Sequence, residues 1–339
     1  MSTAPNHESG IPPFVRPGEH PLQSKRYVVT TPQVEALAAH ISALIDNRTP
    51  GGVVWAPPRT GKSCGLRIVK LEIATNFPNL PVFMLPAWDY TVPKEGPFME
   101  DLLTAAGHAI VKRGKPEDKR DRLVEFMAQV ALDSGFGTVF LIVDEAQQLH
   151  EKHYKWLMGI HNLLALRSVH LITVLVGQHQ LVHQRSAFLR AEKENIVGRF
   201  MVKMFEFRGL RSEKEVRRTL EEYDREEYPV DSGWSFSRYF MPEQFAEGWR
   251  LAGMSEMVWR AFVQAKEFAA KSTEKRPAKK SARTRQDHPF DIPMQYFCRM
   301  VEYFLMRLPK INLGDTVAVD TLAASAVAAS GYLDVLIIE

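Results

Sequence analysis

A short loop rich in proline and glycine carries the first residues whose types and spacing could do chemistry. Residues 56–63 read Ala-Pro-Pro-Arg-Thr-Gly-Lys-Ser. They match the phosphate-loop pattern G-x-x-x-x-G-K-[ST], except that Ala56 replaces the first glycine. Gly61 would let the backbone approach a phosphate closely, Lys62 can reach the β- and γ-phosphates, and the Ser63 hydroxyl can ligate Mg²⁺. The alternative is a chance Gly-Lys-Ser at the start of a helix.

The flanking pattern favours the phosphate loop. An apolar strand is expected at residues 53–55 and a helix at residues 64–73. A loop that joins a strand to a helix points backbone N–H groups and the positive helix end at phosphate oxygens. We therefore predict an ATP-binding segment that consists of Pro58, Arg59, Thr60, Gly61, Lys62, Ser63 and Cys64.

A strongly apolar strand that ends in two carboxylates supplies the second set. Residues 138–143 read Thr-Val-Phe-Leu-Ile-Val and lead directly into Asp144 and Glu145. Carboxylates at the end of a core strand are costly unless they are used. Asp144 would hold Mg²⁺ through water, and Glu145 would act as the general base on the attacking water. An acidic helix N-terminus would explain the pair alone, but the pair and the loop together predict an Mg²⁺-dependent ATPase.

Alternating strands and helices must position these residues. Strands are expected at residues 53–55, 81–85, 138–143, 170–176 and 200–207, with helices between them. This alternation indicates an α/β fold with a mainly parallel central sheet and helices on both faces. After Arg208 the periodicity becomes helical, at residues 213–223 and 254–270, as is typical of a small helical domain.

Composition suggests how the chain is divided. Residues 1–25 hold five prolines and few apolar residues, which is typical of a flexible arm. Residues 271–285 hold seven Lys or Arg against one acid, as a solvated basic linker would. We expect a flexible arm at 1–25, an α/β nucleotide-binding domain at 26–207, a helical lid at 208–270, a basic linker at 271–288 and a C-terminal partner-docking extension at 289–339.

The bulk composition is that of a globular protein. The chain of 339 residues is 45% hydrophobic and 24% charged, and its net charge of +3 does not by itself imply nucleic-acid binding. The two cysteines lie far apart in the sequence and do not indicate a disulfide framework. Residues 1–10 contain no apolar stretch typical of a signal peptide, and no run reaches the length of a membrane span. We expect a cytoplasmic protein with no membrane association.

Both motifs and three further segments resemble AAA+ ATPases. Within that class they look like the transposition regulators TnsC, TniB and MuB of Tn7-like or CRISPR-associated transposons, and like the related helicase loaders. The similarity covers roughly residues 30–270. It is carried by residues 61–63 (Gly-Lys-Ser), 141–147 (Leu-Ile-Val-Asp-Glu-Ala-Gln), 170–178, 195–200 and 205–210. The resemblance implies an AAA+ P-loop NTPase fold with a small helical lid and a C-terminal extension.

The resemblance also assigns roles to residues outside the two motifs. Gln178, at the end of the strand over 170–176, matches sensor 1. Arg199, before an aromatic residue at the entry to the last strand, matches the arginine finger, with Arg190 as the alternative. Sensor 2 is not matched, since Gly253 is followed by Met-Ser-Glu and the nearest arginines are Arg250 and Arg260. This departure leaves the coupling of the lid to nucleotide open.

The same resemblance implies ATP-dependent homo-oligomers, rings or helices, on duplex DNA. A basic turn between two helices suits contacts with DNA phosphates. Glu117, Asp118 and Asp121 would balance the same turn if it were only a solvated loop. Nothing in the sequence indicates base readout, so DNA binding should tolerate any sequence. The predicted DNA-binding residues are Lys112, Arg113, Lys115, Lys119 and Arg120.

The implied function is target selection in DNA transposition in a bacterial cytoplasm. An ATP-bound oligomer on DNA would couple target recognition to recruitment of a transposase, and hydrolysis would disassemble it. Its partners would be a transposase and target-selector proteins such as TniQ-, TnsA- and TnsB-like proteins. Two alternatives stay open: a helicase loader of related architecture, and a nucleotide-gated DNA scaffold whose hydrolysis is incidental.

Overall fold

The computed structural model describes residues 12–274 and 290–338, and these residues form two compact units. Unit 1 contains the described parts of 1–35, 59–61 and 208–339, and unit 2 contains 36–58 and 62–207. The chain passes from the α/β unit to the helical unit between Phe207 and Arg208. Each unit has a hydrophobic core of its own.

Unit 2 is built on a parallel five-stranded sheet of order β2-β3-β4-β1-β5. The central strands are apolar on both faces because helices cover both faces, as parallel sheets require. In β3, every residue from Thr138 to Val143 is buried. The strands are β1 (Gly51–Trp55), β2 (Val82–Pro86), β3 (Thr138–Asp144), β4 (His170–Gly177) and β5 (Lys203–Glu206).

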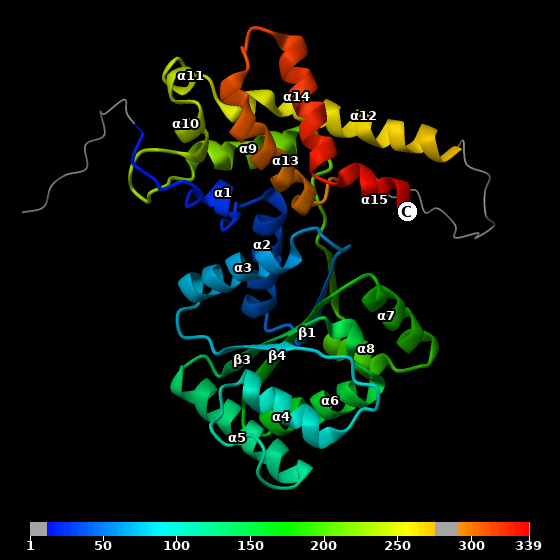
Figure 1. Ribbon diagram of the computed structural model, residues 1–339. Coiled ribbons are helices and arrows are strands. Elements are labelled where there is room, and N and C mark those ends of the chain that lie inside the picture. The colour runs from blue at the N-terminus through cyan, green and yellow to red at the C-terminus, as the bar shows by residue number, and fades with distance from the viewer. Residues whose placement is uncertain (1–11, 275–289, 339) are drawn as a thin grey trace, which may run out of the picture. The chain divides into compact units, whose positions relative to one another are not determined.

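Helices cover both faces of this sheet, α2 and α3 on one side and α4, α5 and α6 on the other (Figure 1). Phe98, Leu123 and Tyr154, from the second group, pack in one core with alternate residues of β3. The helices of unit 2 are α2 (Pro32–Asp46, whose first turn belongs to unit 1), α3 (Lys62–Asn76), α4 (Glu95–Ala105), α5 (Pro116–Asp133), α6 (Glu151–Ala165), α7 (Gln180–Arg190) and α8 (Glu194–Phe200), with the 3₁₀ turn η1 (Ala146–Gln148).

The register of the sheet brings the ends of three strands to one edge. Trp55, the last residue of β1, lies opposite Gly177, the last residue of β4. Val143 of β3 lies opposite Leu175 of β4. Because the strands are parallel, the loop after β1 and the residues after β3 and β4 emerge side by side at the carboxyl edge of the sheet.

Unit 1 is helical, and its helices share one core. Phe262 of α12 and Phe297 of α13 stack with ring centroids 6.4 Å apart. The helices are α1 (Pro21–Ser24), α9 (Glu213–Arg225), α10 (Phe236–Phe240), α11 (Pro242–Ala246), α12 (Ser255–Glu274), α13 (Met294–Arg307), α14 (Thr316–Ala329) and α15 (Tyr332–Ile338), with 3₁₀ turns η2 (Leu251–Met254) and η3 (Leu308–Lys310).

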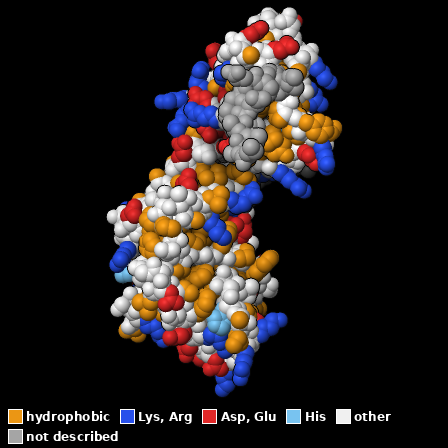
Figure 2. Space-filling view, turned by 90° about the vertical axis from the view of Figure 1, so that its left-hand side faces the viewer, with side chains coloured by type: hydrophobic (Ala, Val, Ile, Leu, Met, Phe, Trp, Pro, Cys, Tyr) orange, Lys and Arg blue, Asp and Glu red, His pale blue; other side chains and the backbone are white. Residues whose placement is uncertain are grey.

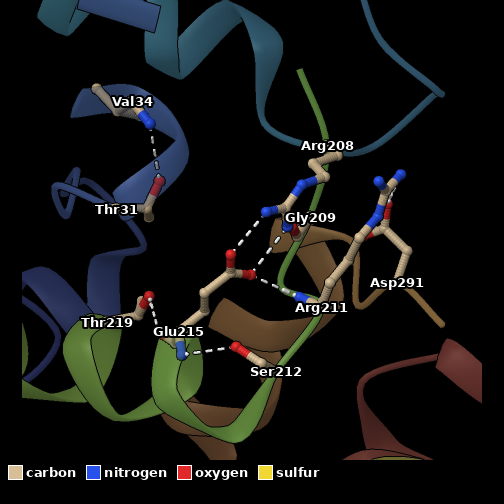
Figure 3. A network of polar contacts seen from close by, with 9 residues as sticks. All are labelled: Thr31, Val34, Arg208, Gly209, Arg211, Ser212, Glu215, Thr219 and Asp291. Carbon is tan, nitrogen blue, oxygen red and sulfur yellow. Dashed lines mark hydrogen bonds and ion pairs between the residues drawn. The ribbon is translucent and has the colours of Figure 1, made fainter. Parts of the chain in front are cut away.

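A polar network holds the start of this unit to the segment before α13 (Figure 3). Glu215 accepts hydrogen bonds from both guanidinium ends of Arg208, at 2.7 and 2.9 Å, and from the backbone N–H of Arg211 at 2.7 Å. The Arg211 side chain pairs with Asp291 at 3.5 Å. Burial alone would raise the pKa of Glu215, but these hydrogen bonds hold it below its usual value.

The residues after 289 are part of the core of unit 1. Phe297, Met300 and Leu305 are fully buried, and α14 adds Ala326. The sequence predicts a C-terminal partner-docking extension at 289–339. In the structure α13 to α15 pack with α9 and α12. Of the expected basic linker, residues 271–274 belong to α12, and residues 275–288 lie outside the described residues.

The expected N-terminal arm is ordered where it is described. Residues 1–11 lie outside the described residues. Within 12–25, α1 forms, and His20 and Leu22 are fully buried. The His20 ring stacks on Tyr239 at 4.5 Å and meets Phe236 edge-on at 5.4 Å. These aromatic contacts join residues far apart in the chain, so the local composition does not reveal them. The prolines and the few apolar residues of this segment therefore suggested an arm without structure.

Candidate nucleotide-binding site

The phosphate loop has the backbone that its sequence requires. Arg59 and Gly61 both have positive φ, 65° and 93°, so the chain turns tightly before α3 begins at Lys62. Ala56 is buried, and its N–H donates to the Gly177 carbonyl at 3.0 Å. The missing first glycine is thus replaced by the smallest side chain that fits a buried position beside β4.

The remaining residues of the loop differ in exposure. Pro58, Arg59 and Ser63 are exposed, and Thr60 is buried. The Arg59 guanidinium donates to the Tyr296 hydroxyl of α13, and both residues belong to unit 1. Cys64 is half-buried, and its Sγ accepts from Arg67 at 3.2 Å.

The lysine of the loop meets the carboxylates at the end of β3. Lys62 Nζ lies 2.8 Å from Glu145 Oε1 and 3.4 Å from Asp144 Oδ1. The lysine side chain is only 11% exposed, against 42% for Glu145. The Lys62 ammonium would attract an incoming polyphosphate strongly, because a cation shielded from water is screened weakly by solvent.

Glu145 has an uncommon backbone conformation. Its φ and ψ are 52° and 35°, in the left-handed region that residues with a side chain seldom adopt. The N–H of Glu145 donates to Asp144 Oδ1 at 2.9 Å. Such strain tends to persist at functional sites, where the surroundings enforce it. Here it turns the Glu145 side chain back toward Lys62 instead of along η1.

Gln178 lies at the same edge, as expected from its position after β4. Its side chain hydrogen-bonds Glu145, and its N–H donates to Gln147 Oε1 at 3.2 Å. Gln147 in turn donates from Nε2 to Glu145 Oε2 at 2.5 Å. Burial alone would raise the pKa of Glu145, but hydrogen bonds from Lys62, Gln147 and Gln178 hold it below its usual value. Gln147 was not predicted, although it stands two positions after Glu145, where a side chain from the next turn can fold back.

The side chains expected to bind Mg²⁺ are suited to it. Ser63 offers an exposed hydroxyl at the start of α3, and Asp144 offers a carboxylate that is 18% exposed. Hydroxyl and carboxylate oxygens suit this hard cation, which usually keeps several waters and binds substrate phosphates. Among residues 12–274 and 290–338, no group of three or more His, Cys, Asp or Glu side chains could hold a metal ion.

Arg199 lies at the opposite, amino edge of the sheet. A Cβ on Gly51, the first residue of β1, would collide with the Arg199 carbonyl, so α8 ends directly against the start of that strand. The Arg199 guanidinium donates to Asn162 Oδ1 on α6 at 2.8 Å. A strand rises about 3.3 Å per residue, so the seven residues of β3 put the two edges roughly 20 Å apart. Arg199 therefore cannot reach the Lys62 site of its own chain.

Arg199 lines a cavity of about 420 Å³ at this edge. Arg48, His161 and His170 line it too, and within residues 12–274 and 290–338 none of its lining residues is an acid. His161 is buried, and its pKa is lowered to about 3 by burial and, secondarily, by the charge of Arg199. His161 is therefore neutral near pH 7, and the two arginines dominate the charge of the cavity. Arg48, which the sequence did not single out, is exposed here and has a φ of 47°.

The other arginines considered from the sequence lie elsewhere. Arg190, the alternative finger, is exposed at the end of α7. Arg250 donates to the carbonyls of Phe245 and Trp249 at 2.9 and 2.7 Å. Arg260 pairs with Asp320 at 2.9 Å. Both candidates for sensor 2 are thus bonded within unit 1.

The expected basic turn is only partly a turn. Lys112, Arg113 and Lys115 are exposed before α5. Lys119 and Arg120 lie within α5, where Lys119 is 7% exposed and pairs with Glu100 at 2.5 Å. Arg120 pairs with Glu95 at 3.2 Å. These two cations are paired with acids that α4 supplies and that the local sequence did not show.

The sheet, its strand order and the loop define an AAA+ P-loop NTPase fold. Residues 46–184 match the family model described as AAA domain. The range includes the phosphate loop, Asp144, Glu145 and Gln178. The comparison with curated proteins gave no match. Among the described residues, no helix combines the length and apolarity that crossing a membrane would need.

Several solved structures are similar to this chain at low identity. The Aeropyrum pernix ORC2 protein, solved as ADPNP and ADP complexes, is 13% identical with a TM-score of 0.43, over 91% of this chain and 83% of that one. Cdc6p from Pyrobaculum aerophilum is 16% identical with a TM-score of 0.43, over 88% and 82%. AMPPCP-bound DnaA from Aquifex aeolicus is 13% identical with a TM-score of 0.36, over 92% and 93%.

Proposed function

We propose that the protein is an ATPase that hydrolyses Mg²⁺-bound ATP at the carboxyl edge of its sheet. The observation that carries this proposal is the cluster of Lys62 Nζ with Glu145 and Asp144, at 2.8 and 3.4 Å. A loop lysine placed against two carboxylates at the end of a core strand is the combination that ATP hydrolysis uses. A purely structural ion pair would not need the left-handed backbone at Glu145.

Each residue of the site has a separate task. The N–H groups of the phosphate loop and Lys62 bind phosphate oxygens. Ser63 and Asp144 hold Mg²⁺, which neutralises phosphate charge when it is bound. Glu145 accepts the proton of the attacking water. Its lowered pKa keeps it ionised at neutral pH, so it is ready to act as a base. Gln178 hydrogen-bonds Glu145 at the same edge.

We propose that Arg199 completes the site of a neighbouring copy. Charge that develops on the γ-phosphate needs an arginine, and Arg199 lies at the wrong edge to serve its own chain. The acid-free cavity that it lines with Arg48 has the charge to receive an anionic group. Exposed Leu166, close in sequence to the cavity residues Ala165 and Val169, adds apolar surface for a contact with another copy. The active form is therefore a homo-oligomer, either a ring or a helix.

Two inactive variants should restore each other if Arg199 acts in trans. Lys62→Ala subunits lack a working pocket but keep the finger, and Arg199→Ala subunits have the reverse defect. In a mixture, an Arg199→Ala pocket that faces a Lys62→Ala subunit receives both halves. We expect partial recovery of ATP hydrolysis, below wild type because only some interfaces pair correctly, measured as phosphate release at several mixing ratios.

The matched control replaces Arg199→Ala with Arg190→Ala, which should be active alone. Co-assembly of the two variants is checked by crosslinking differently tagged chains. If mixed assemblies form and remain inactive at every ratio, Arg199 is not a trans-acting finger, and Arg190 becomes the next residue to test.

We further propose that the oligomer binds duplex DNA through its phosphates. The exposed cations Lys112, Arg113 and Lys115 support this step, whereas Lys119 and Arg120 are already paired with acids. On the face shown in Figure 2, Lys and Arg side chains are intermixed with acidic and apolar ones.

DNA binding should require ATP, tolerate any duplex sequence and weaken steeply with salt. Replacing Lys112, Arg113 and Lys115 with alanine should reduce the slope of log K against log salt by up to about three, roughly 0.9 for each lost phosphate contact. Fluorescence anisotropy at several salt concentrations measures the slope, with Lys70→Ala on α3 as the control. Tight, salt-insensitive binding of one sequence would contradict backbone recognition.

The biological role that we propose is target selection in transposition, of the TnsC, TniB and MuB type. It rests on the D-E-A-Q block and the V-G-Q strand end, residues 144–147 and 176–178. In this role the ATP-bound oligomer marks a DNA target, recruits a transposase with the help of TniQ-, TnsA- or TnsB-like partners, and disassembles on hydrolysis. Genome neighbours that encode a transposase would support it over a helicase loader. Equal turnover with and without DNA would favour a scaffold with incidental hydrolysis.

A further inference from the structure

We propose that Gln147 is a positioning residue for Glu145: it holds one carboxylate oxygen and so presents the other oxygen to the attacking water. The inference rests on the proposed ATPase function and adds a residue to it. Both oxygens of Glu145 accept a hydrogen bond in the structure. Lys62 donates to Oε1 at 2.8 Å, and Gln147 Nε2 donates to Oε2 at 2.5 Å.

Nucleotide binding should affect the hydrogen bonds of the two donors differently. Lys62 is the loop cation that phosphate oxygens would attract, and its departure frees Oε1. Gln147 lies in η1, in the turn directly after β3. Its neutral amide would not be drawn from Glu145 toward the phosphates. Gln147 then still holds Oε2 and Gln178 stays beside the carboxylate, while Oε1 loses its lysine partner on the side from which Lys62 withdrew. A base held at one oxygen is oriented without being blocked.

The orientation of the Gln147 amide is determined by its other contact. Its Oε1 accepts from the backbone N–H of Gln178 at 3.2 Å. Because that N–H can only donate, the amide oxygen must face β4 and the amide nitrogen must face Glu145. Gly177 makes this approach possible, since a Cβ there would collide with Gln147 Oε1. The end of β4 therefore sets the direction in which Gln147 donates.

A second layer of contacts holds the Gln147 backbone. Gln184 of α7 donates from Nε2 to the carbonyl of Gln147 at 2.9 Å and to that of Leu149 at 3.2 Å. Gln184 Oε1 accepts from the buried Tyr154 hydroxyl of α6 at 3.2 Å. Two helices thus hold the turn that carries Gln147, as expected of a support that must be more rigid than the group it orients.

Two substitutions separate the donor from the acceptor. Gln147→Met removes both functions at nearly constant volume, whereas Gln147→Glu keeps an oxygen for the Gln178 N–H, loses the donor and adds a negative charge beside Glu145. We expect both to lower kcat for ATP hydrolysis about tenfold, while the nucleotide affinity of Gln147→Met, measured by calorimetry, changes less than about twofold. If Gln147 only supported β4, Gln147→Glu would retain wild-type turnover, and that result would overturn the proposal.

The split between turnover and affinity supplies a readout that a structural role would not move, because a positioning defect lowers kcat while nucleotide affinity stays nearly unchanged. Gln148→Met, on the same turn, is the matched control and should change neither quantity, because its side chain makes no hydrogen bond among the described residues.

A double variant distinguishes failure of this inference from failure of the ATPase proposal. If Gln147 acts through Glu145, then adding Gln147→Met to Glu145→Gln should slow hydrolysis no further. An additional tenfold loss in the double variant would mean that Gln147 acts independently, and the inference would be wrong. If Glu145→Gln alone hydrolyses ATP at the wild-type rate, the proposed base is wrong, and the role of Gln147 falls with it.

Discussion

Glu145→Gln is expected to bind Mg²⁺ and ATP normally and to slow hydrolysis by about a hundredfold or more, within the usual contribution of a general base. The amide has nearly the shape of the carboxylate, and its single oxygen can still accept from either Lys62 or Gln147. It cannot accept a proton from water, and the chemical step therefore loses its base. ATP-dependent DNA complexes should live longer, because hydrolysis would normally end them.

Phosphate release under single-turnover conditions measures the chemical step, and calorimetry with a non-hydrolysable analogue measures binding. Glu125→Gln is the matched control, since Glu125 is 71% exposed and pairs with the surface residue Arg167. Hydrolysis by Glu145→Gln within about threefold of wild type would show that another group activates the water.

Lys62→Ala is expected to abolish nucleotide binding. Lys62 is the cation that faces both Asp144 and Glu145, with Nζ 3.4 and 2.8 Å from their oxygens. Without it, a triphosphate would approach two uncompensated carboxylates that solvent screens weakly. The change thus removes an attraction and exposes a repulsion, so its effect should exceed that of losing an ordinary surface contact.

Isothermal calorimetry with Mg·ATP tests this, with Lys70→Ala on the exposed face of the same helix as the control. Circular dichroism must show that the variant remains folded, because it leaves two partly buried acids without their cation. A folded Lys62→Ala protein with wild-type affinity for ATP would remove the assignment of this loop.

The sequence alone was sufficient to predict the fold class and the chemical types at the site. Strands that are apolar on both faces and alternate with helices indicate a parallel sheet, and the sheet is parallel. The phosphate loop and the pair Asp144–Glu145 each carry their signal in adjacent residues. In a parallel sheet such segments must meet at the carboxyl edge, so their proximity to Gln178 followed from topology.

Only the tertiary structure decided which partners these residues have. Lys119 and Arg120 looked like part of a DNA-binding turn, but Glu100 and Glu95 of α4 pair with them. The burial of His20 depends on aromatic residues more than 200 positions away. The role of Gln147 depends on the backbone N–H of Gln178, contributed by another strand end. Local patterns specify secondary structure and residue chemistry, whereas burial, pairing and pKa depend on neighbours that folding brings from distant parts of the chain.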